Sequence, residues 1–94
     1  MRNDHPKPKH LAKKLWHIRD YLRVNKTKMS RLLQLNRATR ITEYENGKHI
    51  PPNEVVLRYA RAGKVHMEDI VDDEVSVEDF RKLLGTVAYK QPAK

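Results

Sequence analysis

The 94 residues of this chain include 20 lysines and arginines, 12 aspartates and glutamates and no cysteine, and the net charge is +8. A chain of this length holds one domain with a modest core, and without cysteine it has no disulfide framework, thiolate-bound zinc or thiol nucleophile. It lacks the roughly 20-residue apolar run of a membrane span and the apolar core of a signal peptide, which predicts a soluble, cytoplasmic protein.

The N-terminal part of the chain predicts an arm followed by an amphipathic helix. Residues 1–9 are polar and contain two prolines, which is typical of a flexible basic arm. Four aliphatic residues then recur at helical spacing, namely Leu11, Leu15, Ile18 and Leu22. Four basic residues are expected on the opposite, solvent-facing surface of this helix: Lys13, Lys14, Arg19 and Arg23.

Two short helices separated by a polar turn are predicted next. Asn25 is a favourable N-cap for a helix that ends near Leu35. Its buried residues are expected to be Met29, Leu32 and Leu33. Another helix follows over about 38–46, and Gly47 stops it because glycine readily adopts a left-handed conformation. The buried pair of this helix is Ile41 and Tyr44.

Three more helices and a tail are predicted in the remaining part of the chain. Pro51 and Pro52 precede a fourth helix that Gly63 closes. A fifth short helix comprises residues 67–71, and Ser76 caps a sixth. The sixth helix carries an apolar stripe formed by Val77, Phe80, Leu83 and Leu84. We therefore expect an all-α protein with a globular domain over 10–72, a C-terminal helix over 73–85 and a flexible tail over 86–94.

Several landmarks between Val24 and Ile70 follow one another in a familiar order. They are Met29-Ser30, Leu33, Leu35, Ile41, the block Tyr44-Glu45-Asn46-Gly47-Lys48, Pro51 or Pro52, Leu57 and Tyr59-Ala60-Arg61-Ala62. With these landmarks the segment resembles the Xre-type helix-turn-helix family, the lambda-repressor-like domain of bacterial and phage regulators. The resemblance implies a compact five-helix domain, here with an extra short C-terminal helix. It also implies that the protein binds double-stranded DNA and is associated with the nucleoid of a bacterium or phage host.

The positive charge is concentrated in one half of the chain. Residues 1–50 contain 13 lysines and arginines against 4 acidic residues, whereas residues 51–94 contain 7 against 8. A basic half beside a nearly neutral half is typical of a protein with a polyanionic partner.

The resemblance assigns roles to the residues around the polar turn, because the second helix of such a pair lies in the major groove. The candidate base-contacting residues are Arg37, Thr39, Arg40, Thr42 and Glu43. The candidate phosphate-contacting residues are Asn25, Lys26, Lys28, Asn46, Lys48 and His49. Arginine is the usual bidentate reader of guanine, although these arginines could instead contact only the backbone.

Two points around this turn stay open in the sequence. Glu43 can accept a hydrogen bond from cytosine or pair with Arg40 or Arg37 on its own helix. The interval between Leu35 and Ile41 is one residue longer than the commonest form of the family, so any residue from 37 to 40 could open the third helix. Glu45 is expected to be structural, holding the helix end to nearby backbone or to an arginine.

The expected partners are duplex DNA and a second copy of the chain, since helix-turn-helix proteins usually read paired half-sites about 10 base pairs apart. The apolar stripe of the sixth helix serves either as the dimer surface or as a cap on the domain's own core. Two alternatives belong to other classes. One is an antitoxin whose C-terminal region binds a protein toxin, and the other is an adaptor that binds protein or RNA.

The sequence contains no recognisable catalytic or cofactor site. The five histidines lack the paired spacing of a metal site, and no serine or threonine has a histidine arrangement that suggests a nucleophile. We expect no enzyme activity, metal or cofactor. The aromatic residues could stack on bases, but their helical spacing favours core packing; they are Trp16, Tyr21, Tyr44, Tyr59 and Phe80.

Overall fold

The computed structural model describes residues 8–89. Within them lie six α-helices and no β-strand, which confirms the predicted all-α class. The helices are α1 (Leu11–Leu22), α2 (Lys26–Leu32), α3 (Thr39–Glu45), α4 (Asn53–Gly63), α5 (Met67–Val71) and α6 (Val77–Leu83). Most of the predicted arm, residues 1–7, and the last part of the predicted tail, residues 90–94, lie outside the described residues.

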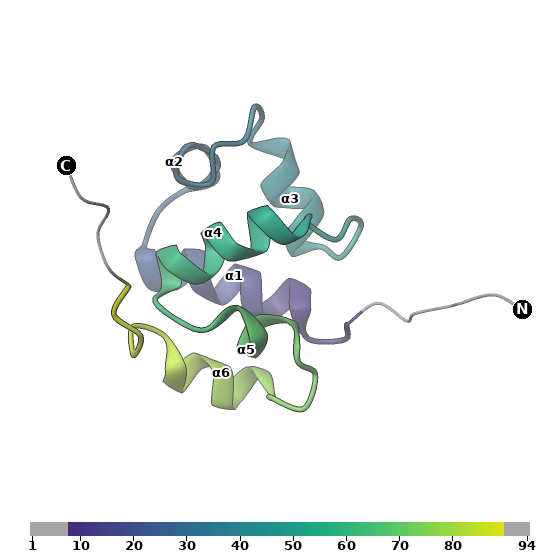
Figure 1. Cartoon of the computed structure of the whole chain (residues 1–94). Coiled ribbons are helices and arrows are strands. Elements are labelled where there is room, and N and C mark those ends of the chain that lie inside the picture. Colours follow the sequence, from purple (N-terminus) through teal and green to yellow (C-terminus); the bar gives the residue numbers. More distant parts are fainter. Residues whose placement is uncertain (1–7, 90–94) are drawn as a thin grey trace, which may run out of the picture.

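Helix α1 is the central element of the fold. It packs against α3, α4, α5 and α6, while α2 packs against α3 and α4 against α5. In Figure 1, α2 and α3 lie on one side of α1, and α5 and α6 lie on the other. The pair α2–α3 therefore forms one end of the domain, as a helix-turn-helix arrangement requires.

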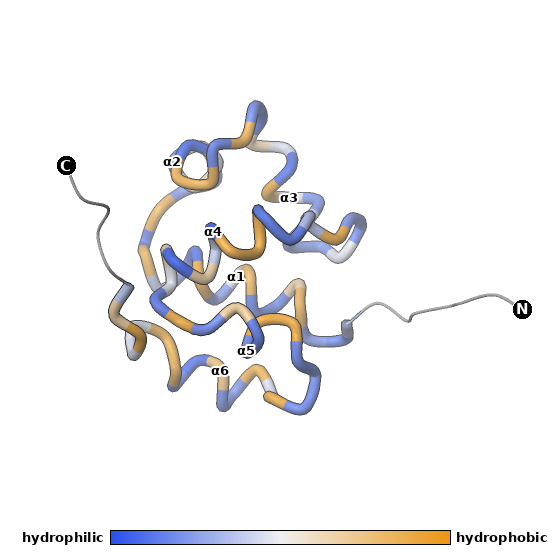
Figure 2. The backbone as a smooth tube through the Cα atoms, in the orientation of Figure 1, coloured by the Kyte–Doolittle hydropathy of each residue, from blue (hydrophilic) through white to orange (hydrophobic). Residues whose placement is uncertain are grey.

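One apolar cluster holds these helices together. Hydrophobic residues recur along every helix of the tube in Figure 2, interleaved with hydrophilic ones. The fully enclosed members include Leu15, Ile18, Met29, Leu33, Ile41, Tyr59, Val65 and Phe80. Burying an aliphatic side chain of this kind contributes about 1.5–3 kcal/mol, so each short helix is stabilised mainly by the one or two residues it adds to the shared core.

Lys14 corrects the prediction that all four basic residues of α1 face solvent. Its side chain is completely buried. It follows Leu11 by three positions and therefore shares the buried face of the helix. Its Nζ donates to the carbonyl oxygens of Asp69 at 2.8 Å and Asp72 at 2.9 Å, so that the lysine caps the C-terminus of α5. Burial lowers the pKa of Lys14, and the neighbouring aspartates oppose that shift.

Asp73, in the loop after α5, caps the N-terminus of α1. The carboxylate of Asp73 accepts hydrogen bonds from the backbone N–H groups of Lys9, at 2.8 Å, and His10, at 3.2 Å. His10 occupies the N-cap position of α1 without a side-chain cap of its own. Each of the two segments thus satisfies backbone groups at an end of the other, which fixes α1 against α5.

Three further residues that were expected in the core are exposed. Leu32 is the last residue of α2 and is 45% exposed, whereas Leu33, one position later, is buried. Trp16 and Tyr21 of α1 are 42% and 44% exposed and do not belong to the core. The aromatic residues that do pack in the core are Tyr44, Tyr59 and Phe80.

Most of the apolar stripe of α6 packs on the domain itself, whereas Val77 is half-buried and does not belong to the core. Phe80 is fully buried, and Leu83 and Leu84 are partly buried against the core. Of the two alternatives for the stripe, Phe80 therefore follows the cap on the domain's own core, because its side chain is enclosed within its own chain. A Cβ on Gly63 would lie 3.2 Å from Ile18 and 3.3 Å from Leu84, so the missing side chain at this position lets α1, α4 and the end of α6 approach closely.

Residues 86–89, which we expected in the flexible tail, are hydrogen-bonded to the link after α4. The backbone N–H of Gly85 donates to Gly63 and that of Val87 to Lys64, each at 2.8 Å. The hydroxyl of Tyr89 donates to the carbonyl of Val65 at 2.6 Å. These bonds keep the segment after α6 against the domain.

Candidate nucleic-acid interface

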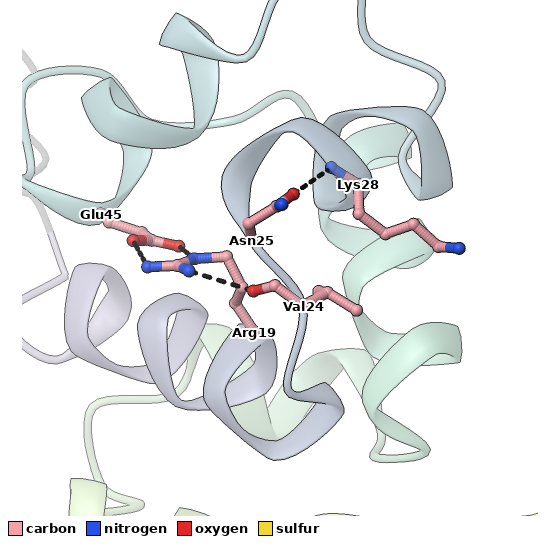
Figure 3. A network of polar contacts seen from close by, with 5 residues as sticks. All are labelled: Arg19, Val24, Asn25, Lys28 and Glu45. Carbon is pink, nitrogen blue, oxygen red and sulfur yellow. Dashed lines mark hydrogen bonds and ion pairs between the residues drawn. The ribbon is translucent and has the colours of Figure 1, made fainter.

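The first helix of the pair begins as its sequence predicts. The side-chain oxygen of Asn25 accepts from the backbone N–H of Lys28 at 2.8 Å (Figure 3), so Asn25 is the N-cap of α2. Lys28 is exposed, and Lys26 is partly exposed on the same first turn. The cap orients this turn, and the two ammonium groups it carries are accessible to an anion.

The structure shows at which residue the third helix begins. Its first helical residue is Thr39, and Ala38 occupies the N-cap position without a side-chain cap. Ile41 and Tyr44 are buried, as predicted. The two threonines and the arginine on the other side of the helix, Thr39, Thr42 and Arg40, are all exposed. Arg37 is exposed in the turn just before them.

A bidentate ion pair fixes the far end of α3. Arg19 of α1 donates from Nε to Oε2 of Glu45 at 2.7 Å and from Nη2 to Oε1 at 3.0 Å. Its Nη1 donates to the carbonyl oxygen of Val24 at 3.1 Å, just before α2. Figure 3 shows this guanidinium between the carboxylate of Glu45 and the chain segment that leads into α2. Glu45 raises the pKa of Arg19 through the hydrogen bond.

This contact corrects one prediction and confirms another. Arg19 was expected on the solvent-facing surface of α1, but its side chain is only 17% exposed. Glu45 was expected to hold the helix end, and it does so through Arg19. Because one guanidinium reaches all three segments, it sets the position of α3 relative to α1 and to the start of α2.

Glu43 faces its own helix and the loop that follows. Its Oε1 lies 3.5 Å from Nη1 of Arg40 and 4.0 Å from Nε2 of His49. Of the two arginines considered as its partner, the structure pairs it with Arg40. Both side chains remain partly exposed, so the pair does not remove Arg40 from the surface.

The turn after α3 brings the remaining candidate phosphate contacts to the surface. Gly47 has φ +80°, the left-handed conformation predicted for it. The side-chain oxygen of Asn46 accepts from the backbone N–H of Lys48 at 2.8 Å, which leaves its amide group as a donor. Lys48 and His49 are exposed, and their backbone N–H groups both donate to the carbonyl of Glu43.

A hollow of about 280 Å³ lies beside the turn between the two helices. Arg37, Arg40 and Arg58 line it, together with Glu54 of α4. Arg58 also donates from Nη1 to the carbonyl oxygen of Leu33 at 3.1 Å, at the end of α2. Sequence reasoning missed Arg58, because an arginine in the middle of α4 has no local signal that would place it beside α2.

The candidate residues thus divide by their surroundings. Arg37 and Arg40 line the same hollow, and Glu43 lies within 4.0 Å of both Arg40 on α3 and His49 in the turn after it. The candidate dimer residues lie elsewhere, on α6 and at Leu84 just after it. No group of three histidine or carboxylate side chains within residues 8–89 is arranged to hold a metal ion, and no helix in this range is long and apolar enough to cross a membrane.

Comparison with protein families, characterised proteins and solved structures finds no match to this chain. The resemblance to the helix-turn-helix family accordingly rests on the residues named above.

Proposed function

We propose that this protein is a sequence-specific regulator of transcription that binds double-stranded DNA with α3 in the major groove. The observation that carries the proposal is the division of α3 into two faces. Ile41 and Tyr44 anchor one face in the core, and Thr39, Arg40 and Thr42 are exposed on the other. A major groove admits a helix, and arginine and threonine are side chains that read its base edges.

The charges next to α3 support the same arrangement. Lys28 on α2 and Lys48 and His49 after α3 are exposed on either side of the helix in the sequence. Cations that flank a helix in the groove would meet the phosphates on its two sides. Phosphate neutralisation releases counterions and supplies affinity that does not depend on sequence, so these residues would position α3 while its own side chains discriminate bases.

Selection of bound sequences from a random pool of duplexes tests this proposal. We expect one enriched motif of a few base pairs, and for a homodimer two such motifs related by two-fold symmetry. Half-sites one helical turn apart, about 10 base pairs, or a multiple of it are expected. A pool that remains random after several rounds would refute sequence-specific binding.

A parallel titration separates the remaining readings. Fluorescence anisotropy with labelled duplex DNA, single-stranded DNA and RNA should give the tightest binding to duplex. A preference for RNA would replace the proposal by an RNA adaptor. Binding to none of the three would leave a protein partner, such as a toxin, as the ligand of this fold.

A further inference from the structure

The hollow beside the turn between α2 and α3 is lined by arginines from three segments of the chain. Arg37 comes from the turn, Arg40 from the start of α3 and Arg58 from the middle of α4. We call this hollow the arginine hollow. Its volume of about 280 Å³ is close to the lower limit of about 300 Å³ for small-molecule sites. It therefore suits a compact ligand.

Two of the three guanidinium groups have no carboxylate partner. Within residues 8–89, neither Arg37 nor Arg58 forms an ion pair. Arg58 donates from Nη1 to the carbonyl oxygen of Leu33, and its other side-chain N–H groups bond to no atom of this range. Because the bond to Leu33 ties the guanidinium to the end of α2, its remaining donors are held at the hollow before a ligand arrives, which lowers the entropy cost of binding.

The turn adds further donors at the same place. Asn36 and Arg37 line the hollow, and their backbone N–H groups donate to no acceptor within the described part of the chain. Backbone and guanidinium N–H groups both donate to oxyanions, and arginine binds phosphate through two parallel hydrogen bonds. This set of donors therefore favours a phosphate group over a cation or a neutral ligand.

The charge of the lining indicates which kind of phosphate fits. The three arginines and Glu54 give three positive charges against one negative charge, a net of +2. Glu43, which lies 3.5 Å from Arg40, is not a lining residue. A phosphate monoester carries a charge of about −1.5 to −2 at neutral pH, which matches the lining. Each phosphate of a nucleic-acid backbone carries only a single negative charge.

We propose that the arginine hollow binds a small phosphate monoester and that the bound ligand weakens DNA binding. Arg37 and Arg40 line the hollow and are also candidate base-contacting residues, so their guanidinium groups cannot serve the ligand and a base at once. A dianion beside α3 also repels the phosphates of a duplex. The site itself requires no DNA, whereas its effect on DNA affinity rests on the proposed function.

Titration of the full chain with two matched probes tests the site without DNA. Methyl phosphate is a monoester and dimethyl phosphate is the corresponding diester, and both are added at constant ionic strength. In proton–nitrogen NMR spectra, the backbone amides of Asn36 and Arg37 and the Nε–H group of Arg58 should shift saturably with methyl phosphate. Dimethyl phosphate should bind about tenfold more weakly. Equal binding of the two probes would assign the hollow to a nucleic-acid backbone and overturn the proposal, as would shifts that do not saturate.

Two substitutions in the lining should change this affinity in opposite directions. Arg58→Gln removes a positive charge and should raise the Kd of methyl phosphate about tenfold. Glu54→Gln removes the negative charge, keeps the bond between Arg58 and Leu33, and should lower the Kd about threefold.

Arg61→Gln is the matched control for these variants. Arg61 is exposed on the same helix as Arg58 but does not line the hollow, so this substitution should leave the Kd of methyl phosphate unchanged. Equal effects of Arg58→Gln and Arg61→Gln would indicate attraction by net charge alone and would contradict the site. A Kd that does not fall in Glu54→Gln would contradict it as well.

The effect on DNA binding is measured with a labelled duplex. At saturating methyl phosphate, the duplex Kd of the wild type should be about tenfold higher than in dimethyl phosphate of the same ionic strength. This difference should disappear in Arg58→Gln. A duplex affinity that bound methyl phosphate does not change would rule out the regulatory effect. A chain that binds methyl phosphate but no duplex would refute the proposed function and retain the phosphate site, so the two failures are distinguishable.

Discussion

Arg19 and Glu45 form the contact that joins the central helix to the candidate recognition helix. The two side chains are 17% and 7% exposed, and two parallel hydrogen bonds of 2.7 and 3.0 Å join them. A buried carboxylate without its partner is costly. The position of α3 on the domain therefore depends on an ion pair as well as on the burial of Ile41 and Tyr44.

Replacing Glu45 tests this dependence. Glu45→Gln keeps the shape of the side chain but removes the charge that compensates Arg19, and we expect the free energy of unfolding to fall by about 2 kcal/mol. Urea denaturation followed by circular dichroism measures the loss. The loss should appear as a lower midpoint with an unchanged slope, because the core stays the same.

A neighbouring glutamate on the same helix provides the matched control. Glu43 pairs with Arg40 at 3.5 Å, where the two side chains are 29% and 55% exposed. Exposed pairs of this kind contribute about 0–1 kcal/mol, so Glu43→Gln should change stability far less than Glu45→Gln. Equal losses for the two variants would show that the bidentate contact has no special role.

The buried lysine of α1 gives a second stability prediction. Lys14→Met preserves much of the apolar stem but leaves the carbonyls of Asp69 and Asp72 without their donor, so we expect a loss of about 1–2 kcal/mol. Thermal unfolding of this variant should be compared with that of Lys13→Met. Lys13 is exposed one position earlier on the same helix, and a substitution there should stay within about 0.5 kcal/mol of the wild type. An unchanged or more stable Lys14→Met protein would contradict a capping role.

The positions of the helices could be predicted from local sequence signals. Asn25, Ser76 and Gly47 are recognised by their own side chains or by the lack of one, and the structure uses them as predicted. The exposed residues of α3 also follow from the periodicity that places Ile41 and Tyr44 inside. These signals are local, so they survive in a single sequence.

Contacts between distant segments could not be predicted in this way. A lysine is usually a surface residue. Lys14 is buried because its Nζ donates to the carbonyl oxygens of Asp69 and Asp72, more than 50 positions away. Arg19 is held by hydrogen bonds to Glu45. Arg58 is held by a hydrogen bond to the carbonyl of Leu33, at the end of α2. Trp16 and Tyr21 fit helical core spacing, but no other helix encloses them, and they are 42% and 44% exposed. In each case the partner, not the residue type, decides where the side chain lies.

The acidic residue that caps α1 predicts a pH dependence. Hydrogen bonds from the backbone N–H groups of Lys9 and His10 lower the pKa of Asp73 below its ordinary value of 3.8. A carboxyl whose folded-state pKa is depressed stabilises the fold above its unfolded-state pKa, and this contribution is lost as the pH falls through the folded-state value. Asp73→Ala should therefore have a lower Tm than the wild type at neutral pH, and the difference should shrink below pH 3.8.

Thermal unfolding from neutral to strongly acidic pH checks this prediction. Glu74→Ala is the control, since Glu74 is the next residue and is also exposed in the same loop. Its Tm should follow that of the wild type at every pH. A difference between Asp73→Ala and wild type that stays constant into acid would mean that the cap does not require the charged carboxylate.

The salt dependence of DNA binding tests the flanking cations. If Lys28 neutralises a phosphate, Lys28→Ala should weaken binding to all duplexes and lower the slope of log K against log salt by about one unit. Lys64 is exposed at the C-terminal end of α4, outside the candidate interface, and Lys64→Ala should leave the slope unchanged. Equal changes for both lysines would indicate a general effect of net charge and would contradict a phosphate contact at Lys28.

Arg40 distinguishes base reading from backbone contact on α3. If its guanidinium reads a guanine, Arg40→Ala should reduce discrimination by about 1–3 kcal/mol at one or two base pairs and leave the others unchanged. Binding to the selected duplex and to each of its single-base variants measures this. Arg61→Ala, an exposed arginine on α4, controls for the loss of one positive charge. A uniform loss across all duplexes would assign Arg40 to the phosphate backbone. Because Arg40 also pairs with Glu43, the double variant Arg40→Ala, Glu43→Gln then shows whether the freed carboxylate repels DNA: removing it would restore affinity without restoring the base preference.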